Sequence, residues 1–342
     1  MSDCFRICED QKKIKLDLKD RKILSLLSEN SRMPLTQMAH KVQLSRDAVN
    51  YRIKRMVTKG VIQRFFPIVD LKRFGYYTYH IFLVLDEKDQ GEQAKFIEEL
   101  KQHPNVKYVI EHSDRWDLEI SLVAKDLKDF DKVNTDIVSK HPNLILEKEK
   151  LALIKGYHSI HLPQVIYWEA DQKVKFEKEE TKPIKLDEKD FKILKLLSKD
   201  ARMSSAVIGG KIGLSHDSVS VRIRQMQKAN IIRKFTVLVN LSALDYNWYT
   251  YVIQMRLIDN KTDRKLREFI RQHPYVIRAV QTLGTWDLLL HIVSDSPTQF
   301  HKTVKEIKNE FADTIKNYAT YIAFKEHYYE PFPDVIKFDS EK

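Results

Sequence analysis

The sequence predicts an α+β fold made of two copies of one unit, each a winged helix-turn-helix followed by a ferredoxin-like βαββαβ domain. Two observations support this prediction. The chain repeats itself at a constant spacing of 170 residues, and 22 of the 50 positions in 16–65 are identical in 186–235 without a gap. Within each copy, the hydrophobic periodicity changes from helical spacing to strand alternation. A register held over so long a stretch indicates that a whole unit was duplicated.

Each copy opens with two predicted helices. Asp17 and Asp187 occupy N-cap positions, and each is followed three residues later by another aspartate, a variant of the capping box. The second helix begins near Pro34 in the first copy, where proline suits an early helical position, and near Ser204 in the second. Leucines and isoleucines at helical spacing follow both caps, so we expect one face of each helix to be buried.

The third predicted helix has a buried stripe and an exposed basic face. Ser45 and Ser215 cap it, and apolar residues recur at i, i+4 and i+7. These residues are Val49, Ile53 and Met56 in the first copy and Val219, Ile223 and Met226 in the second. Gly60 and Asn230, usual helix terminators, lead into what we interpret as the first strand of a wing. This arrangement is typical of a winged helix-turn-helix, whose third helix fits the major groove of DNA.

The rest of each copy has the order strand, helix, strand, strand, helix, strand, which is ferredoxin-like. The expected elements are 76–85, 92–102, 106–111, 118–124, 127–140 and 145–154, with counterparts at 248–257, 263–272, 276–282, 288–293, 297–311 and 315–324. The predicted domains are an N-terminal extension (1–15), winged helix-turn-helix 1 (16–70), ferredoxin-like domain 1 (71–160), a linker (161–185), winged helix-turn-helix 2 (186–240), ferredoxin-like domain 2 (241–332) and a tail (333–342). We expect Tyr167 and Trp168 to dock part of the linker. The two ferredoxin-like domains should pair sheet to sheet, within one chain or between chains, and we favour pairing within the chain.

Positive charge is concentrated in the two helical modules. Residues 16–65 carry 11 Lys and Arg against 4 Asp and Glu, and residues 186–235 carry 11 against 5. The net charge of the whole chain is +11, so the remaining residues are slightly acidic. A lysine-rich surface that only aids solubility would be spread evenly, whereas this distribution indicates a polyanionic partner, double-stranded DNA.

Other classes of function receive little support from the sequence. No apolar run approaches the ~20 residues of a membrane span, and residues 1–15 lack the core of a signal peptide, so a cytoplasmic location is expected. Cys4 and Cys8 stand alone, too few for a structural zinc site, and are expected to be free thiols. We expect no metal, no cofactor and no catalytic residues, because no nucleophile–base set, carboxylate pair or phosphate loop is present.

Three motifs in the same order give the chain a family resemblance. They are the Leu-Asp-x-x-Asp opening of the first helix, the Leu-Ser start of the third, and the Trp-Asp turn between the central strands, which reads Gly284-x-Trp286-Asp287 in the second copy. On these motifs both copies resemble the Lrp/AsnC family, the feast/famine transcription regulators, over about 16–160 and 186–332. The resemblance implies a DNA-binding regulator modulated by a small molecule, with an amino acid as the expected effector class.

The resemblance and the helix faces together indicate candidate binding residues. The DNA-contacting candidates are Arg46, Asn50, Tyr51, Arg52, Lys54 and Arg55, and His216, Ser220, Arg222, Arg224 and Lys228. Arg52 and Arg222 lie beside the buried stripe and suit phosphates or packing better than base edges. The effector candidates are Gly284, Thr285 and Asp287, with Asp114 and Asp117 at the matching turn of the first copy. Because Asp114 stands where the family pattern has glycine, that first pocket is altered or lost, and its Trp-Asp pair reads equally well as a structural turn.

Three alternatives to a promoter-specific regulator remain open at this stage. Winged helices also serve as protein-interaction modules, and the family resemblance extends to proteins that organise chromatin. Siroheme decarboxylases resemble the same two-domain layout, but the Arg-Arg-x-Gly and His-Asn-Tyr-like segments of those enzymes are replaced here. The corresponding residues read Gln63-Arg64-Phe65-Phe66 and Glu111-His112-Ser113-Asp114 in the first copy. We interpret His112 as a surface or turn histidine and expect no enzyme activity.

Overall fold

The computed structural model describes residues 5–9, 12–86, 88, 90–166, 185–257 and 259–338. The chain divides into two compact units, each assembled from both copies of the repeat. The first, here called the barrel unit, comprises 1–15, 77–165 and 240–329, and the second, the helix-turn-helix unit, comprises 16–76, 166–239 and 330–342. Tyr167, Trp168 and most of the predicted linker lie outside the described residues. No helix in the described ranges is long and apolar enough to cross a membrane.

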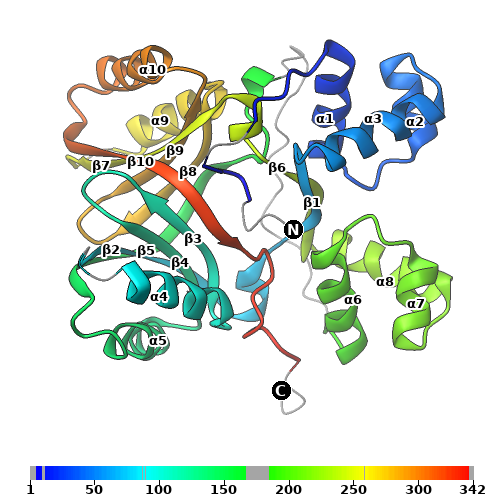
Figure 1. The fold of residues 1–342 in the computed structure, drawn as a ribbon, viewed down its shortest axis with the longest axis horizontal. Helices are drawn as coiled ribbons and strands as arrows, with labels where there is room; N and C mark the ends of the chain where they lie inside the picture. Colours follow the sequence, from blue (N-terminus) through cyan, green and yellow to red (C-terminus); the bar gives the residue numbers. More distant parts are fainter. Residues whose placement is uncertain are drawn as a thin grey trace. The chain divides into compact units, whose positions relative to one another are not determined.

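In the helix-turn-helix unit, each copy supplies three α-helices and one strand, and the first copy also supplies a 3-10 helix (Figure 1). The first copy gives α1 (Leu18–Glu29), α2 (Leu35–Val42), α3 (Arg46–Thr58), β1 (Ile62–Val69) and η1 (Leu71–Phe74). The second gives α6 (Glu188–Lys199), α7 (Ser205–Ile212), α8 (His216–Lys228) and β6 (Ile232–Val239), and η2 (Gln164–Ile166) lies in the predicted linker before them. The caps explain where the helices begin: Asp17 and Asp187 both form complete capping boxes, and Ser204 accepts a hydrogen bond from the backbone of α7.

The strand that follows each third helix pairs with its counterpart from the other copy. β1 and β6 form a two-stranded antiparallel ribbon in which Phe65 lies opposite Val237. Each strand predicted to open a wing is therefore present, but in the described residues its partner comes from the other copy. The ribbon makes one body of the two helical modules, because every backbone hydrogen bond of its ladder crosses between copies.

Two arginines reinforce this joint from either side. The Arg32 guanidinium donates to the carbonyl of Met203 at 2.9 Å and lies over the Phe235 ring, 5.4 Å from its centroid. Arg202 makes the matching contacts in the other direction, to the Ser31 carbonyl at 2.8 Å and over Phe65 at 5.4 Å. We did not predict these contacts from the sequence. The signal for them was that Arg32 and Arg202 are identical residues one repeat apart.

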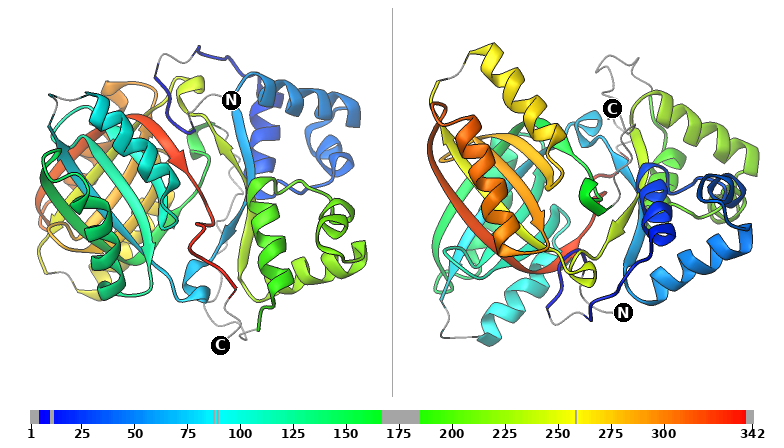
Figure 2. Two further views of the ribbon diagram at one scale, coloured as in Figure 1. Left: turned by 60° about the horizontal axis from the view of Figure 1, so that its bottom comes forward. Right: turned by 90° about the horizontal axis from the view of Figure 1, so that it is seen from above.

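The barrel unit contains the two ferredoxin-like domains (Figures 1 and 2). The first consists of β2 (Tyr77–Leu85), α4 (Gln90–Gln102), β3 (Val106–His112), β4 (Leu118–Ala124), α5 (Leu127–Ser139) and β5 (Ile145–Ser159). The second consists of η3 (Ser242–Leu244), β7 (Asn247–Met255), α9 (Asn260–Gln272), β8 (Val276–Leu283), β9 (Leu288–Ser294), α10 (Pro297–Glu310) and β10 (Ile315–Tyr329). Both last strands are longer than predicted, because their second halves pair with the other copy.

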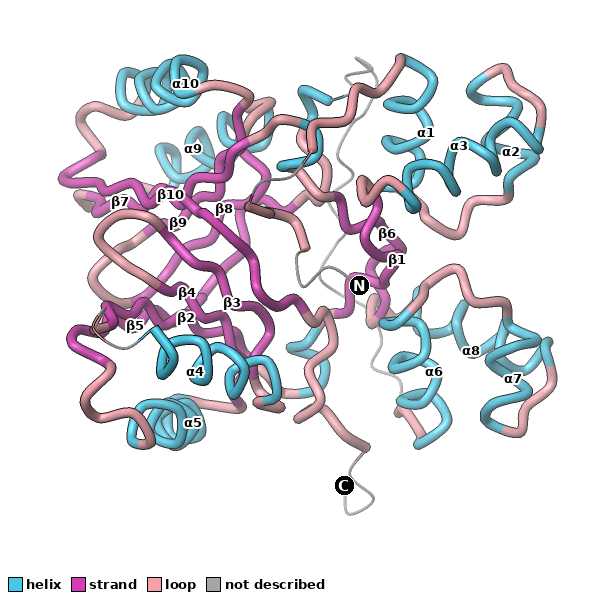
Figure 3. The backbone as a smooth tube through the Cα atoms, viewed as in Figure 1, coloured by secondary structure: helices cyan, strands magenta, loops and turns pink. Residues whose placement is uncertain are grey.

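The eight strands close into one barrel in the order β10-β3-β4-β2-β5-β8-β9-β7. The seams between copies are β5 with β8 and β10 with β3, both antiparallel. The two domains thus pair within the chain, which is the arrangement that we favoured, and they join through strand edges as well as through the facing sheets. Closure leaves neither sheet with an unpaired edge strand, and the tube in Figure 3 follows the strands around the barrel.

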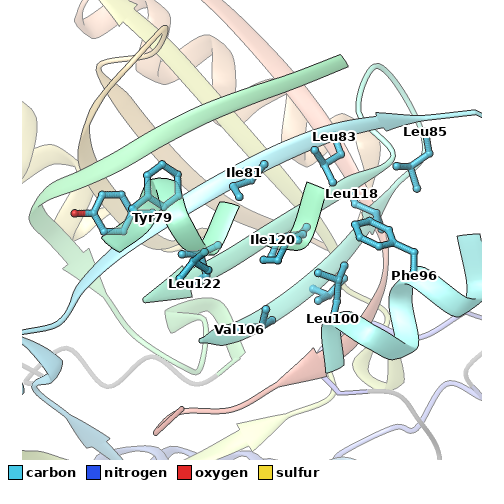
Figure 4. Packing of buried hydrophobic residues seen from close by; sticks show 14 of the residues in the cluster. Tyr79, Ile81, Leu83, Leu85, Phe96, Leu100, Val106, Leu118, Ile120 and Leu122 are labelled. Atoms are coloured by element: carbon cyan, nitrogen blue, oxygen red, sulfur yellow. The ribbon is translucent and has the colours of Figure 1, made fainter. Parts of the chain in front are cut away.

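Alternate residues of each strand face opposite sides of the barrel wall. The outward set of the first copy packs beneath α4 and α5, and Figure 4 shows Ile81, Leu83 and Ile120 of this set together with Phe96 of α4. The inward set forms a cluster shared by both copies, with members Phe82, Trp116, Leu151, Val252, Val280, Trp286, Leu289 and Tyr321. The N-terminal segment belongs to this unit, and Cys8 is disulfide-bonded, so the prediction of free thiols is wrong for that residue.

Candidate nucleic-acid interface and effector turns

The third helices α3 and α8 begin at serine caps, as predicted. Ser45 accepts from the Ala48 backbone at 3.1 Å and Ser215 from the Ser218 backbone at 3.2 Å. The stripe of three apolar residues on each helix is buried against its own module. Their opposite faces therefore point away from the core, which leaves those faces available to a partner.

The exposed face of α3 carries most of its predicted DNA-contacting residues. Arg46, Tyr51 and Lys54 are exposed, Tyr51 to 66%, and Asn50 is half-buried. On α8 the exposed candidates are His216, Arg224 and Lys228, while Ser220 is half-buried and donates to Ser205 of α7 at 3.0 Å. The two faces differ in chemistry as well as position, because Val221, 43% exposed, stands where α3 has tyrosine.

Arg52 and Arg55 serve the fold of the first module. Arg52 donates to Asp17 at 2.6 Å and to Asp20 at 2.7 Å, and Arg55 also pairs with Asp20. The Asp20 side chain is fully buried, so these guanidinium groups neutralise a charge inside the module. Burial would raise the pKa of Asp17, but hydrogen bonds from Arg52 and the Asp20 backbone outweigh it and lower that pKa.

In the second module, Arg222 neutralises the matching aspartates without the help of a second arginine. It contacts Asp187 and Asp190, each at 2.8 Å, and Gln225 occupies the position of Arg55. A groove of about 980 Å³ runs beside this ion pair, lined by Lys185, Asp187, Asp190, Asp217, Ser218, Val221, Arg222, Gln225, Met226, Lys228 and Ala229. Of the predicted DNA-contacting set, Arg52, Arg55 and Arg222 are therefore already engaged within the protein.

The predicted effector residues lie at two separate turns, one in each copy. Gly284 has φ +149°, and a Cβ atom there would lie 2.7 Å from both the Lys150 carbonyl oxygen and Leu151 Cδ2. Glycine is therefore required for the close approach of this turn to β5 of the first copy. At the matching turn, the Asp114 carboxylate accepts from the Ile322 backbone of β10 at 2.8 Å. Each turn thus rests on the last strand of the other copy.

Asp117 and Asp287 hold the turns to their own sheets. Asp117 Oδ2 accepts from the Leu85 backbone at 2.6 Å, and Asp287 Oδ2 accepts from the Met255 backbone at 2.7 Å. The Thr285 carbonyl accepts from the Gln254 side chain at 2.8 Å. These contacts give both Trp-Asp pairs a structural role.

Glu149 of β5 is a carboxylate beside the Gly284 turn that the sequence reasoning missed. Its Oε1 atom is buried and makes no hydrogen bond within the described residues, and its carboxylate faces Thr285 and Trp286. Burial raises the pKa of Glu149, although the Arg115 guanidinium partly opposes the change. No sequence signal indicated this residue, because its copy-two counterpart is alanine and the pairing of β5 with β8 is tertiary.

A second polar group lies inside the barrel, around the fully buried Glu119. The neighbours of its carboxylate are Tyr108 (2.7 Å), His80 (3.0 Å), Thr250 (3.1 Å), His112 (3.2 Å) and His291 (3.7 Å). His112 is thus a core residue, and the interpretation as a surface or turn histidine is wrong. Burial lowers the pKa of His80, and lowers that of His291 to about 3, so both imidazoles are neutral near neutral pH. Among the described residues, no three His, Cys, Asp or Glu side chains form a group suited to a metal ion.

The chain matches known proteins in three segments. Residues 16–63 match the winged helix-turn-helix DNA-binding domain, residues 186–227 the AsnC-type helix-turn-helix domain, and residues 250–331 the Lrp/AsnC ligand binding domain. The structure is similar in fold to the siroheme decarboxylase NirDL, with a TM-score of 0.61, 13% identity, and coverage of 93% of this chain and 97% of that one. At that identity the likeness concerns the fold alone.

Sequence relatives cover about one copy each. An HTH-type transcriptional regulator of Mycobacterium tuberculosis is 30% identical over 138 residues, which are 40% of this chain and 92% of that protein. The leucine-responsive regulatory protein of Rhizobium meliloti is 29% identical over 142 residues, 40% of this chain and 90% of its own length. The matches to the AsnC-type helix-turn-helix and Lrp/AsnC ligand binding domains, together with a relative that is 30% identical over 92% of its length, show that the chain belongs to the Lrp/AsnC family of DNA-binding transcription regulators.

Proposed function

We propose that this protein acts in the cytoplasm as a regulator that binds an asymmetric DNA site, with α3 and α8 reading different half-sites. The observation that supports this most is the joining of two dissimilar recognition helices in one unit by β1 and β6. A two-fold symmetric protein favours palindromic DNA, because the symmetry of the site mirrors that of the protein. Here the two helices share their buried stripes but differ on their exposed faces.

The first copy should supply most of the base discrimination. Arg46 can form paired hydrogen bonds with guanine and Asn50 with adenine, whereas His216 and Ser220 at the matching positions lack a comparable fork. Val221 can contact only a thymine methyl group. We propose that Tyr51, Lys54, Arg224 and Lys228 complete the two faces, mainly through contacts with phosphates.

Selection of binding sites from random duplexes tests this proposal. The expected consensus has two unlike halves, and Asn50→Ala should relax preference in one half only, with a loss of ~1–3 kcal/mol of discrimination there. Ser220→Ala is the matched control and should leave the first half unchanged. Lys54→Ala should reduce affinity for all sequences alike and lower the slope of log K against log salt by ~0.9.

A palindromic consensus in which Asn50→Ala affects both halves equally would refute the asymmetric reading. Uniform protection of unrelated DNA by the intact chain would favour the chromatin-organising alternative over a regulator of particular promoters. We propose regulation in place of catalysis, because the sequence relatives are regulators while the likeness to a decarboxylase is limited to fold.

We further propose that a small-molecule effector of the amino-acid class binds at the Gly284 turn. The Asp287 carboxylate, one of the effector candidates, accepts from the Met255 backbone, so we assign the contact with the ammonium group of the effector to Glu149. An ammonium group beside a half-buried carboxylate would favour its ionised form and satisfy the buried Oε1 atom. Backbone amides near Gly284 and Thr285 would then meet the effector carboxylate.

Calorimetric titration with a panel of amino acids tests the assignment. Glu149→Gln should abolish binding of the amino acid that the wild-type chain takes up, while DNA affinity without ligand stays unchanged. Arg115→Gln is the control for charge near the turn and should preserve binding. Ligand affinity that survives Glu149→Gln would place the effector elsewhere.

A further inference from the structure

The N-terminal segment buries an arginine in the barrel unit. The Arg6 guanidinium carbon lies 4.7 Å from the ring centroid of Trp248, 4.6 Å from that of Tyr329 and 5.6 Å from that of Tyr108. Trp248 and Tyr108 are each only 1% exposed. Aromatic faces at these distances attract a planar cation, and the attraction grows when water is excluded.

A carboxylate completes this aromatic enclosure. Glu326 of β10 is fully buried and accepts from Arg6 Nε at 3.1 and 3.0 Å, from its Nη2 atom, and from the Arg6 backbone amide at 2.9 Å. Burial alone would lower the pKa of Arg6, but the Glu326 carboxylate outweighs it and raises that pKa. Two donors of one planar group meeting both carboxylate oxygens is a geometry that guanidinium satisfies and ammonium does not. We call Glu326, Trp248, Tyr329 and Tyr108 the guanidinium cage.

Within the described ranges the cage has no equivalent in the first copy. The first-copy counterparts of Glu326, Trp248 and Tyr329 are Gly156, Thr78 and Ser159, none of which can hold a guanidinium group in this way. The seam of the barrel at β5 closes although the first copy lacks these side chains. The shared fold therefore does not require Glu326, Trp248 and Tyr329. The second copy instead has a buried anion, Glu326, and its partner Arg6 lies outside the repeat.

Residues 5–8 hold the Arg6 guanidinium group in the cage. The Arg6 carbonyl accepts from the Leu241 backbone at 2.7 Å, the Ile7 carbonyl from the Glu326 backbone at 3.0 Å, and the Cys8 amide donates to Ser242 Oγ at 3.0 Å. The Glu326 carboxylate contacts the guanidinium group and the backbone amide of Arg6, and the Glu326 backbone also donates to the Ile7 carbonyl. A free alkylguanidine can make the same side-chain contacts.

We propose that the guanidinium cage is a ligand site for compounds of the arginine and alkylguanidine class, which residues 5–8 occupy in this structure with Arg6 as a tethered substitute. A buried carboxylate left without its cation is strongly destabilised, so the vacated cage should take up a replacement cation. The planar fork and the stacked rings select guanidinium over ammonium. This proposal does not depend on DNA binding or on the Gly284 turn, and its test reads neither.

Arg6→Ala in the full chain, titrated calorimetrically with methylguanidine, arginine and lysine, tests the cage. We expect saturable binding of methylguanidine and arginine, with lysine at least tenfold weaker. Wild type should bind arginine at least tenfold more weakly than Arg6→Ala, because Arg6 competes for the cage. Absence of saturable binding to Arg6→Ala, or equal affinity for lysine and arginine, would overturn the proposal.

Two further variants separate a ligand site from a purely structural anchor. In the Arg6→Ala background, Trp248→Leu should weaken arginine at least tenfold, whereas Arg115→Gln, remote from the cage contacts, should not. If Arg6→Ala does not fold, it is refolded with methylguanidine or methylamine present. Recovery with methylguanidine alone supports the cage, and no recovery with either compound shows that Arg6 is only an anchor.

Discussion

The two copies of the barrel unit share a backbone plan but use different chemistry at equivalent positions. The first copy places Glu119 inside the barrel where the second has Leu289, and it places Asp114 at the turn where the second has Gly284. Both turns nevertheless rest on the opposite copy, one through a side-chain hydrogen bond and the other through close backbone approach. Because both copies lie in one chain, each contact between them occurs only once. The residues at equivalent positions of the two copies can therefore differ.

The turn joints should show the largest difference between copies. In Gly284→Ala, the new Cβ would meet the Lys150 carbonyl at 2.7 Å in a backbone conformation that disfavours alanine. We expect a loss of ~3 kcal/mol in the free energy of unfolding of the barrel, measured with urea. Asp114→Ala removes one exposed hydrogen bond and should cost ~1 kcal/mol. Equal costs for the two variants would mean that the joints do not differ as described.

The next difference lies between the buried aspartates of the two helical modules. Arg222→Ala leaves Asp190 without an arginine partner, whereas Arg52→Ala leaves Asp20 paired with Arg55. We expect a loss of ~2–3 kcal/mol for Arg222→Ala and ~1 kcal/mol for Arg52→Ala in urea unfolding of the helix-turn-helix unit. Arg52→Ala combined with Arg55→Ala should match the cost of Arg222→Ala. If Arg52→Ala mainly reduces DNA affinity and leaves stability intact, its assignment to the fold is wrong.

We expect the smallest of the three effects from the buried histidines inside the barrel, which should lower the free energy of unfolding in mild acid. In the unfolded chain His291 takes up a proton near pH 6.5, but in the folded barrel burial holds its pKa at about 3. The unfolded state therefore binds more protons in this range, so stability is intact above pH 6.5 and falls as the pH is lowered. Each such histidine contributes ~1.4 kcal/mol per pH unit, or ~2 kcal/mol between pH 6.5 and 5.

His291→Ser, which gives the second copy the residue of the first at Ser121, isolates this contribution. Urea unfolding of the barrel at pH 7 and 5 should show a pH-dependent loss smaller by ~2 kcal/mol than in the wild type. The lowered pKa of His80 acts in the same direction, so some acid sensitivity should remain. An unchanged difference between the two pH values would show that His291 is not buried in its neutral form.

The order of the elements was readable from the sequence because it depends on local signals. Capping residues such as Asp17 and Ser215, helical stripes such as Val49 and Ile53, and strand alternation act over a few neighbouring positions. The repeat spacing supplied the duplication, and the exposed positions of α3 and α8 followed from the opposite faces of those stripes. These features specified the two modules of each copy and the helix faces proposed to meet DNA.

Only the tertiary structure decided which residues of the two copies contact each other. The ribbon of β1 with β6, the closed barrel, the burial of Glu119 and the cage around Arg6 all join residues more than 100 positions apart, for which a single sequence carries no local signal. The role of Arg52, which the sequence left open between phosphates and packing, was decided by its distance of 2.7 Å to Asp20. A charged side chain pairs with whichever opposite charge is nearest in space, and that distance is set by packing of the whole chain.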